Sequence, residues 1–408
     1  MIRAKVQQCW QGLGLAIALS LGLVGCAPNP AVKPAIPEAG GISPGRIPAA
    51  DPLAPVRPLV RPPVRIPRPA LPQPTRPVPP QSAYVPPPPV IIPPSTDGLP
   101  VATGANYLAY PAMQAFLAQM QREHGFDRAW LEQLFAGVQR ENEVLAKVQT
   151  PAEGKPWHQY RPIFLTEDRI GSGVAFWQRH APVLDAAARH YGVDPAYIVA
   201  IIGVETLYGR NTGKHNVLRS LTTLAFDFPK RADFYRKELE QYLLLVREER
   251  LNPAALSGSY AGAMGLGQFI SSSYRQYAQD FNHDQRRDLW HPDDAIGSVA
   301  NYLARHGWQA GEDVAAPAYV SGQGYARLLN DKPVKPTLGL TELGVAGVVP
   351  AMPLRVRQAG LVGLEGQGGQ EFWVVGSNFY VITRYNHSSK YAMAVHQLAD
   401  AIRQRMGR

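Results

Sequence analysis

Apolar residues recur every three or four positions over most of the chain from Asn106 onward, the spacing that gathers side chains on one face of an α-helix. Met113, Phe116, Leu117 and Met120 follow this pattern. The other segments that follow it lie around Trp130, from Phe176 to Leu184, and at 233–250, 292–306 and 393–406. The pattern predicts a mainly helical protein.

The pattern changes after Pro333, where the helical spacing gives way to short runs that are typical of strands. Leu-Arg-Val-Arg at 354–357 and Phe-Trp-Val-Val-Gly at 372–376 indicate strands, with the Gly-rich stretch 363–369 between them. We therefore predict a small β part at about 334–380. The fold class that these patterns favour is mainly α (α+β).

The first 25 residues have the pattern of an export signal. Arg3 and Lys5 precede an apolar run at 12–24, which is too short to span a bilayer comfortably. The run ends in Leu-Val-Gly-Cys at 23–26, which resembles a bacterial lipobox, so Cys26 is the expected lipidation site. An ordinary signal peptide with an unrelated cysteine is the alternative.

Cysteine usage and the residue after Cys26 extend this prediction. Cys9 would be removed with the signal, so Cys26 would be the single remaining cysteine and no intramolecular disulfide could form. Ala27 in place of Asp resembles lipoproteins that Gram-negative bacteria sort to the outer membrane. We expect a protein anchored by lipid to the periplasmic face of that membrane, because several acyl chains anchor stably.

Segment 26–100 is dominated by proline, with 25 of the 39 prolines between Ala27 and Pro100. A segment with so many prolines cannot form α-helices or the hydrogen bonds of a β-sheet, so we expect polyproline II structure or disorder. The segment is either a passive tether or a cationic strip that binds anionic wall polymers or lipid headgroups. The remaining region, 101–408, is large enough for a catalytic domain.

Composition narrows the function further. A single long apolar run excludes a polytopic membrane protein, two cysteines exclude a disulfide scaffold, and 45% hydrophobic residues exclude a wholly disordered chain. Of the net charge of +9, only +3 lies beyond residue 100. The main region is thus mildly basic, and it lacks zinc-ligand spacing or a dense basic helix, so nucleic acid is not an expected partner.

One predicted helix places an acid among apolar residues. Asp194 and Pro195 are typical of a helix start, and Gly209 is an expected stop. Ile198, Ile201 and Ile202 define an apolar stripe, and Glu205 occupies its next position. Burial favours the neutral form of a carboxyl group and raises its pKa, which suits a general acid. The alternative is a buried ion pair between Glu205 and an arginine such as Arg210 or Arg231.

A Gly-rich segment follows at 257–269. Its glycines at 258, 262, 265 and 267 would let backbone approach a ligand closely, and Gln268 offers both donors and acceptors. The segment is not a phosphate loop, because no Gly-Lys-Ser/Thr follows it. A hydroxyl-rich sugar would suit such a surface, and a tight turn that packs helices is the alternative.

Several ordered motifs together resemble one family. They are Gly-Val-Glu-Thr at 203–206, Gly209-Arg210, Ser-Tyr-Ala-Gly-Ala-Met-Gly-Leu-Gly-Gln-Phe at 259–269, Ala-Ile-Gly-Ser-Val-Ala-Asn-Tyr at 295–302 and Thr-Arg-Tyr-Asn-His-Ser at 383–388. From about Tyr107 to Arg408 the chain resembles the membrane-bound lytic transglycosylase B family, which cleaves murein. The resemblance implies a lysozyme-like helical core, a helical subdomain and a small β subdomain.

The resemblance also implies roles for individual residues. Glu205 is the implied catalytic acid. The implied sugar contacts are Tyr160, Ser259, Gln268, Tyr302, Tyr385, Asn386 and Tyr391. Tyrosine suits sugar binding because its face stacks on a pyranose while its hydroxyl bonds to it, although core packing is the alternative for each.

The expected reaction needs one carboxyl group. Ordinary glycoside hydrolysis uses two, and the sequence offers no second acid placed like Glu205. Glu205 would protonate the oxygen between N-acetylmuramic acid and N-acetylglucosamine in peptidoglycan. It would then take a proton from the muramoyl C6 hydroxyl, which attacks C1 and forms a 1,6-anhydro end. A murein hydrolase that uses water and a noncatalytic wall-binding lipoprotein are the two alternatives.

Segment 280–288 places oxygen ligands at alternating positions, as in the first half of an EF-hand loop. The candidate ligands are Asp280, Asn282, Asp284 and Asp294. The family resemblance also implies calcium here. The loop departs from the standard pattern at Gln285, where Gly is usual, and at His291, where Glu is usual. We expect a weak structural calcium site or a solvated polar turn, and no cofactor for the chemistry itself.

Overall fold

The computed structural model describes residues 106–149, 154–329 and 333–407, and all of them belong to one unit of contacting elements. The predicted signal peptide (1–25), the Pro-rich segment (26–100) and Cys26 lie outside the described residues. Within the described ranges, the structure has no helix with the length and apolar character needed to cross a bilayer.

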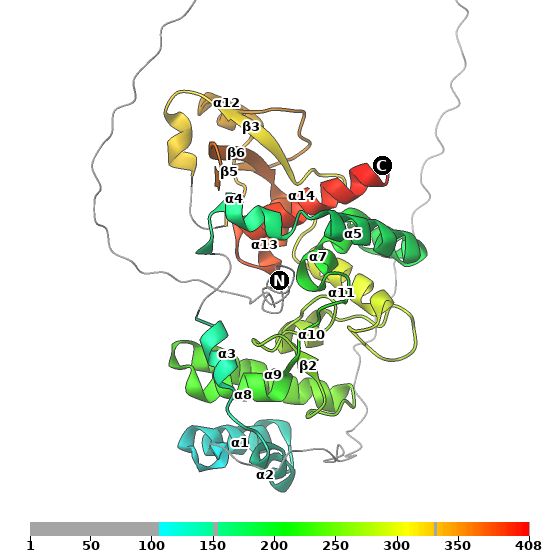
Figure 1. Ribbon diagram of the computed structural model, residues 1–408, viewed down its shortest axis with the longest axis vertical. Helices are drawn as coiled ribbons and strands as arrows, with labels where there is room; N and C mark the ends of the chain where they lie inside the picture. Colours follow the sequence, from blue (N-terminus) through cyan, green and yellow to red (C-terminus); the bar gives the residue numbers. More distant parts are fainter. Residues whose placement is uncertain (1–105, 150–153, 330–332, 408) are drawn as a thin grey trace, which may run out of the picture. The chain divides into compact units, whose positions relative to one another are not determined.

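The described residues are mainly helical with one small sheet, so the predicted fold class is confirmed (Figure 1). The α-helices are α1 (Pro111–His124), α2 (Arg128–Ala136), α3 (Asn142–Lys147), α4 (Trp157–Tyr160), α5 (Glu167–Arg179), α6 (Ala181–Tyr191), α7 (Pro195–Thr206), α8 (Val217–Asp227), α9 (Ala232–Glu248), α10 (Ser271–Tyr277), α11 (Pro292–Arg305), α12 (Leu340–Val345), α13 (Ser377–Tyr385) and α14 (Ser389–Arg405). Short 3₁₀ turns are η1 (Tyr107–Ala109), η3 (Arg161–Ile163), η4 (Pro229–Arg231) and η5 (Gly324–Leu328).

The helical spacing of apolar residues predicted most of these elements, with two errors in their bounds. The run from Phe176 to Leu184 is two helices, because α5 ends at Arg179 and a proline at position 182, in the first turn of α6, favours the start of a new helix. The last helix begins at Ser389, before the expected 393, because the Ser388 side chain caps it by accepting from the backbone N–H of Tyr391.

The sheet contains β3 (Ala315–Val320), β4 (Val348–Pro350), β5 (Ala359–Gly366) and β6 (Gly369–Gly376) in the antiparallel order β4-β3-β6-β5. The predicted strand at 372–376 is confirmed as part of β6. The predicted start at 334 is wrong, since β3 begins at Ala315. The Gly-rich stretch does not separate two strands but forms the β5–β6 hairpin itself.

The strand predicted at 354–357 is absent from the described structure. Backbone groups there bond outside the sheet: the Arg355 N–H donates to the Asp313 carboxylate (2.7 Å), and the Asp313 N–H donates to the Arg355 carbonyl (2.9 Å). An alternating pattern cannot distinguish such a loop from a strand, because both expose every second side chain.

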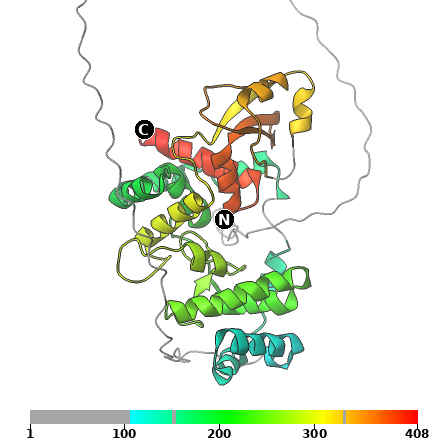
Figure 2. The ribbon, with the colours of Figure 1, turned by 180° about the vertical axis from the view of Figure 1, so that it is seen from behind.

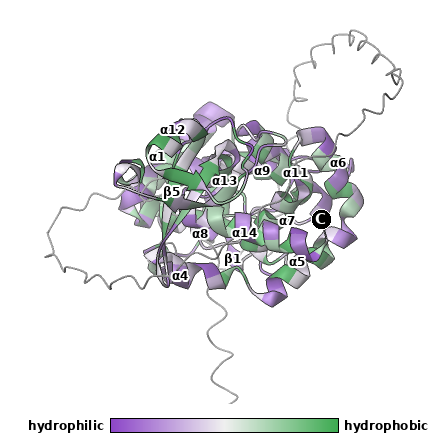
Figure 3. Ribbon diagram, turned by 90° about the horizontal axis from the view of Figure 1, so that it is seen from above, coloured by the Kyte–Doolittle hydropathy of each residue, from purple (hydrophilic) through white to green (hydrophobic). Residues whose placement is uncertain are grey.

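Helix α7 lies at the centre of the helical core, packed against α5, α6, α11 and α14. All residues from Ala196 to Thr206 are buried, so the expected one-sided stripe of Ile198, Ile201 and Ile202 is wrong. A helix that is apolar on every side is enclosed on every side. By contrast α5 is amphipathic, and Figure 3 shows its hydrophobic and hydrophilic residues interspersed.

A second group of helices forms the helical subdomain. Helices α8 and α9 lie side by side, with α1 and α2 next to them in both Figure 1 and Figure 2. A two-residue ribbon connects α8 with the Gly-rich segment, since β1 (His215–Asn216) pairs with β2 (Ser257–Gly258). The ribbon therefore brings the segment that starts at Ser257 to the end of α7, where the chain turns toward β1.

Candidate active site

Glu205 lies in the last turn of α7, and local sequence signals determine where that helix runs. The Asp194 carboxylate caps the start by accepting from the Ala196 N–H (2.8 Å), and Pro195 occupies the first turn. The helix ends at Thr206, before the expected stop at Gly209, because Leu207 already adopts a left-handed conformation (φ 52°). Glu205 is thus placed at the end of a buried helix, with 9% of its surface exposed.

A hydrogen bond from α14 fixes the Glu205 carboxyl group. The Tyr391 hydroxyl donates to Glu205 Oε1 over 2.6 Å. Burial raises the pKa of Tyr391 well above its usual range, and the negative charge of Glu205 raises it further. Tyr391 therefore keeps its proton and acts as a donor to the acid throughout the pH range in which a carboxyl group titrates.

Tyr385 adds a second aromatic hydroxyl beside the acid. Its ring lies nearly parallel to that of Tyr391, with centroids 6.5 Å apart and planes 9° apart. Its hydroxyl donates to the Gly267 carbonyl (2.5 Å) in the Gly-rich segment. Burial raises the pKa of Tyr385 well above its usual range, followed by the charge of Glu205. The pair Tyr385–Tyr391 therefore connects Glu205 with the Gly-rich segment.

Arg169 on α5 holds the end of α7, and the sequence analysis missed it. Its Nη1 donates to the carbonyls of Gly203 (2.7 Å) and Val204 (3.3 Å), the last-turn carbonyls of the helix. Burial lowers the pKa of Arg169, and Glu205 is among the charges that raise it. A cation at a helix C-terminus is favourable. A lone arginine on an amphipathic helix gives no signal for this role in the sequence.

Thr206 connects α7 with the Gly-rich segment. Its hydroxyl oxygen lies 3.1 Å from the Ile202 carbonyl and 3.0 Å from the Leu266 carbonyl, and it accepts from the Gly209 N–H (3.0 Å). Thr206 belongs to the motif at 203–206, but its role became visible only when Leu266 was brought next to it. The contact fixes the position of the Gly-rich segment relative to Glu205.

The glycines of the Gly-rich segment approach the protein's own atoms rather than open space. A Cβ atom at Gly258 would lie 2.3 Å from the Ala263 carbonyl oxygen, and one at Gly265 would lie 2.6 Å from the Leu289 carbonyl oxygen. The expectation that these two glycines exist for close approach to a ligand is therefore wrong. Tight packing of the chain on itself, the alternative, explains them.

Ser259 and Gln268, two predicted sugar contacts, brace this packed segment. The Ser259 hydroxyl oxygen accepts from the N–H groups of Ala261 (3.2 Å) and Ala263 (3.0 Å). The Gln268 amide donates to the carbonyls of Thr212 (3.1 Å) and Gly265 (2.9 Å). Both side chains are buried. Sugar contact by these two residues stays a prediction.

The remaining predicted contacts fall on the same side of the core. The Tyr302 hydroxyl donates to the Arg384 carbonyl (2.6 Å), and its ring lies 4.8 Å from that of Tyr385. Asn386 caps the end of α13 directly after Tyr385. Tyr160 is fully buried, and its ring centroid lies 5.0 Å from that of Phe164. The structure thus connects Tyr385 and Tyr391 with Glu205, with Tyr302 one ring further away, and sugar contact by Tyr160 stays a prediction.

The two arginines offered as alternative partners of Glu205 have other contacts. Arg210 forms an ion pair with Asp168 (2.9 Å) and donates to Ser172 (2.7 Å). The Arg231 guanidinium lies 4.1 Å from the centre of the Phe234 ring. These contacts account for both arginines without an ion pair to the acid.

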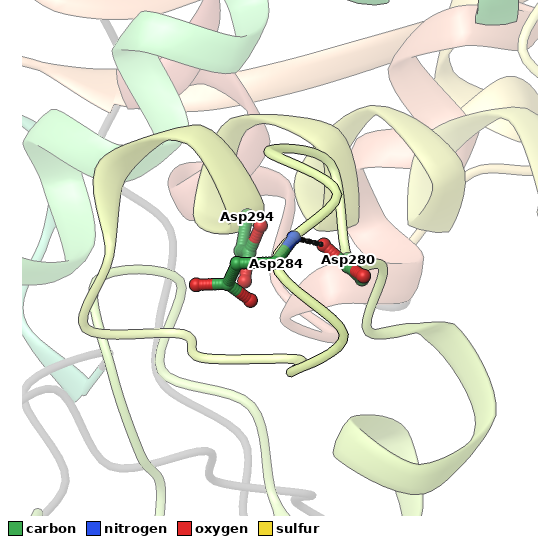
Figure 4. Close-up of side chains that lie close together, drawn as sticks. All are labelled: Asp280, Asp284 and Asp294. Atoms are coloured by element: carbon green, nitrogen blue, oxygen red, sulfur yellow. Dashed lines mark hydrogen bonds between the residues drawn. The ribbon is translucent and has the colours of Figure 1, made fainter.

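The predicted cation loop brings three carboxylates together (Figure 4). Asp280, Asp284 and Asp294 each have a ligand oxygen within 4.8 Å of the others. Asp294 projects from α11 into the loop and is fully buried, whereas Asp284 is exposed. Asn282 lies at the same turn and donates to Asp284 (3.1 Å). An oxygen-only set of this kind suits a hard cation such as calcium.

Backbone N–H groups hold the loop carboxylates in place. Asp294 accepts from Phe281 (2.8 Å), Asn282 (3.2 Å) and Asp288 (2.8 Å). Burial raises the pKa of Asp294 even though these donors lower it. Asp280 accepts from the N–H groups of Asp284 (3.1 Å) and Gln285 (2.8 Å). The loop is thus already folded around the carboxylates.

The residues that depart from the standard EF-hand pattern have roles of their own in the structure. Gln285 adopts the left-handed conformation (φ 69°) that explains the usual Gly at this position. His291 caps α11 by accepting from the Asp293 N–H (3.3 Å) and so is not placed as a ligand. Arg287 forms an ion pair with Glu249, so its charge is compensated outside the loop.

Comparisons with known proteins agree with this geometry. The model of the transglycosylase SLT domain matches residues 109–400. The chain is 43% identical over 310 residues to membrane-bound lytic murein transglycosylase B of Escherichia coli, covering 73% of this chain and 84% of that protein.

Two solved structures are similar as well. Soluble lytic transglycosylase SltB1 of Pseudomonas aeruginosa is 46% identical, with a TM-score of 0.69 over 73% of this chain and 100% of that chain. Escherichia coli lytic transglycosylase Slt35 in complex with calcium is 42% identical, with a TM-score of 0.69 over 76% of this chain and 97% of that chain.

A lysozyme-like helical core with a buried glutamate at the end of its central helix defines the class as lytic transglycosylase. Within that class, the chain belongs to the transglycosylase SLT domain family. The family that the sequence motifs resembled is therefore confirmed.

Proposed function

We propose that the protein cleaves the glycan strands of peptidoglycan at the β-1,4 bond between N-acetylmuramic acid and N-acetylglucosamine, and leaves 1,6-anhydromuramoyl ends. The observation that carries this proposal is the buried Glu205 carboxyl group, held by Tyr391 at the end of α7 in a chain of this family. Relatives named for murein and lytic transglycosylase activity support the substrate class.

In the first step Glu205 acts as a general acid. Its proton moves to the oxygen between the two sugars, the bond from that oxygen to muramoyl C1 breaks, and N-acetylglucosamine leaves as an alcohol. The positive charge that develops at C1 lies beside the newly formed carboxylate, which stabilises it. Burial of Glu205 supports this role because desolvation favours the protonated acid.

In the second step the Glu205 carboxylate acts as a general base. It accepts the proton of the muramoyl C6 hydroxyl, and the C6 oxygen forms a bond to C1 of the same sugar. The acid is thereby restored, and no water is consumed. The nucleophile belongs to the substrate, so it competes well with water for C1. The reaction therefore needs no second carboxyl group from the protein.

Tyr391 and Arg169 support both steps by holding Glu205 in place. The Tyr391 hydroxyl orients the carboxyl group and stabilises its ionised form. Arg169 fixes the two carbonyls directly before Glu205 and contributes a positive charge. Tyr160, Ser259, Gln268, Tyr302, Tyr385 and Asn386 are the proposed sugar contacts around them.

Product analysis tests the proposal. Purified sacculi incubated with the protein should release muropeptides with anhydro ends, each one water lighter than the product of hydrolysis. Reducing ends would support the murein hydrolase alternative. Intact sacculi, with the protein still bound to them, would support the noncatalytic wall-binding alternative.

We also propose that Asp280, Asn282, Asp284 and Asp294 hold a structural calcium ion. The loop fits the ion because its carboxylate oxygens converge and because backbone donors fix all three of these carboxylates. The calcium in the Slt35 structure supports this assignment. A calcium ion bound there would neutralise the negative charges of the loop carboxylates and of Asp294 on α11. The chemistry of Glu205 does not require the ion.

We propose that Cys26 carries a lipid anchor and places the protein on the periplasmic face of the outer membrane. The lipobox-like sequence at 23–26 and a relative named as membrane-bound support this proposal. Cys26→Ala should abolish labelling by radioactive palmitate and release the protein from the membrane fraction, with Cys9→Ala as the matched control. Persistent labelling of Cys26→Ala would contradict the proposal.

A further inference from the structure

The chain turns back on itself directly after the last turn of α7. Leu207, Tyr208 and Gly209 have φ angles of 52°, 58° and 86°, so three successive residues adopt the left-handed conformation. This conformation is unfavourable for residues with a Cβ atom, because that atom comes too close to the following carbonyl oxygen. Strained backbone persists only where surrounding contacts hold it, and it is common at functional sites. Tyr208, which the proposed mechanism does not use, makes such contacts.

The Tyr208 side chain lies against both α5 and α7. Its hydroxyl donates to the Arg169 carbonyl over 3.0 Å, and its ring centroid lies 5.5 Å from that of Phe176 on α5. Two glycines leave room for the hydroxyl, since a Cβ atom at Gly173 on α5 or at Gly203 on α7 would lie 2.4 Å from its oxygen. Burial raises the pKa of Tyr208 above its usual range, so the hydroxyl keeps its proton and stays a donor.

Arg169, which accepts from Tyr208, also contacts α7 through its own side chain. Its guanidinium donates to the carbonyls of Gly203 (2.7 Å) and Val204 (3.3 Å), directly before Glu205. Its backbone carbonyl accepts from Tyr208, three residues after Glu205. The chain on both sides of the acid is thus attached to one residue of α5. Attachment on both sides limits movement of the acid, and the rate of proton transfer depends on the geometry of the acid.

We propose that Tyr208 is a positioning residue, which acts through Arg169 to keep the Glu205 carboxyl group directed at the glycosidic oxygen. The proposal rests on the proposed transglycosylase reaction. Loss of the Tyr208 hydroxyl would release the Arg169 backbone, so the guanidinium would hold the carbonyls of Gly203 and Val204 less firmly. The acid would remain in the site but would reach the productive geometry less often. A misplacement of about 1 Å can lower a rate about 10²-fold.

Kinetics of the full chain on purified sacculi test the proposal, with muropeptide release measured over a range of sacculus concentrations. Tyr208→Phe removes the hydroxyl and keeps the ring. It should lower kcat about ten-fold and leave the apparent KM unchanged, because the hydroxyl affects the geometry of the acid and not the binding of substrate. Tyr242→Phe is the matched control. That hydroxyl also donates to a backbone carbonyl, of Pro253 (2.7 Å), but it lies on α9 in the helical subdomain, so its loss should leave kcat unchanged.

A double-mutant cycle tests whether Tyr208 acts through Arg169. Arg169→Lys keeps the positive charge but replaces the planar guanidinium. Adding Tyr208→Phe to Arg169→Lys should lower kcat little further, because both changes interrupt the same support of the acid. If Arg169→Lys fails to fold, Arg169→Gln takes its place. If Tyr208→Phe fails to fold, Gly203→Ala takes its place, because the new methyl group would displace the Tyr208 hydroxyl.

Four results would overturn the proposal. They are an unchanged kcat in Tyr208→Phe, an equal loss of kcat in Tyr208→Phe and Tyr242→Phe, a raised KM with unchanged kcat, and losses that multiply in the double-mutant cycle. Each of them is measured against a wild type that releases anhydro ends. A wild type that releases none would instead contradict the proposed function, and this proposal with it.

Discussion

Two buried carboxyl groups, Glu205 and Asp294, are held in opposite ways. Asp294 accepts three backbone N–H groups from residues that lie 6 to 13 positions away in the chain. Glu205 is held by a side-chain hydroxyl from Tyr391, 186 positions away. Backbone donors form a fixed shell for an ionised group, whereas an aromatic hydroxyl orients a group without preventing proton exchange. The difference suits a structural site and a catalytic site, respectively.

The largest effect is expected for removal of the titratable group of the catalytic site. Glu205→Gln retains the shape of the side chain but cannot donate or accept the reacting proton. Turnover of sacculi, measured by release of muropeptides, should fall by about 10²–10⁴-fold, while binding to sacculi is largely retained. Glu365→Gln is the matched control. Turnover of Glu205→Gln within a few-fold of wild type would contradict the catalytic assignment.

Calcium should stabilise the folded protein through the loop around Asp294 and leave catalysis by Glu205 unchanged. An ion that binds only the folded state stabilises it by about 2.7 kcal/mol at a hundred-fold excess over Kd. The melting temperature should rise with millimolar calcium and fall after chelation, while turnover at low temperature barely changes. Asp284→Ala should lose the response, and Asp293→Asn should keep it. If calcium does not change the melting temperature of the wild type, the calcium proposal is wrong and the loop is only a polar turn.

A smaller effect is expected when the hydroxyl that orients Glu205 is removed. Tyr391→Phe keeps the ring and should lower turnover about ten-fold, the value of one hydrogen bond to a charged group. Because the hydroxyl stabilises the ionised carboxylate, its loss should raise the pKa of Glu205. The alkaline limb of the pH–rate profile should then move to higher pH. Lower turnover with an unmoved profile would show that Tyr391 acts only by packing.

The smallest effect concerns a third buried group, His396, which forms a hydrogen bond with Tyr197 (2.9 Å) in the first turn of α7, at the other end of that helix from Glu205. Burial lowers its pKa from 6.5, and the charge of Asp400 opposes this shift. The unfolded chain therefore binds a proton below pH 6.5 that the folded chain does not. Stability should decrease as pH falls from 6.5, by at most about 1.4 kcal/mol per pH unit. Melting curves of His396→Gln should show a flatter dependence than wild type, and identical slopes would contradict this account.

The sequence predicted several features that depend on neighbours along the chain, although it missed the helix break before α6 and the Ser388 cap of α14. Helix spacing, the Asp194 cap and the alternating acids of the cation loop all act within a few residues. The position of Glu205 on an apolar helix was also visible. What could not be predicted is which surfaces meet: a stripe of isoleucines cannot reveal that α7 is enclosed on every side.

The supporting residues of the site show the same limit. Arg169 and Thr206 act through Gly203 and Leu266, which other elements bring into contact with them. The glycines at 258 and 265 indicated a close approach, and only the fold revealed that the approaching atoms belong to the protein. Likewise, the segment 354–357 has the alternating pattern of a strand. It is a loop because the Arg355 backbone N–H bonds to Asp313 instead of to a neighbouring strand.

The long separation between Glu205 and Tyr391 has a consequence for the timing of activity. At 5–20 residues per second, a ribosome adds Tyr391 about 10–40 s after Glu205. Throughout that interval the nascent chain has the acid but lacks the helix that orients it and covers α7. A chain interrupted before α14 would expose an apolar helix, which proteases recognise, and would carry an unoriented acid. The pairing of α7 with α14 thus makes completion of the polypeptide a condition for cutting the polymer.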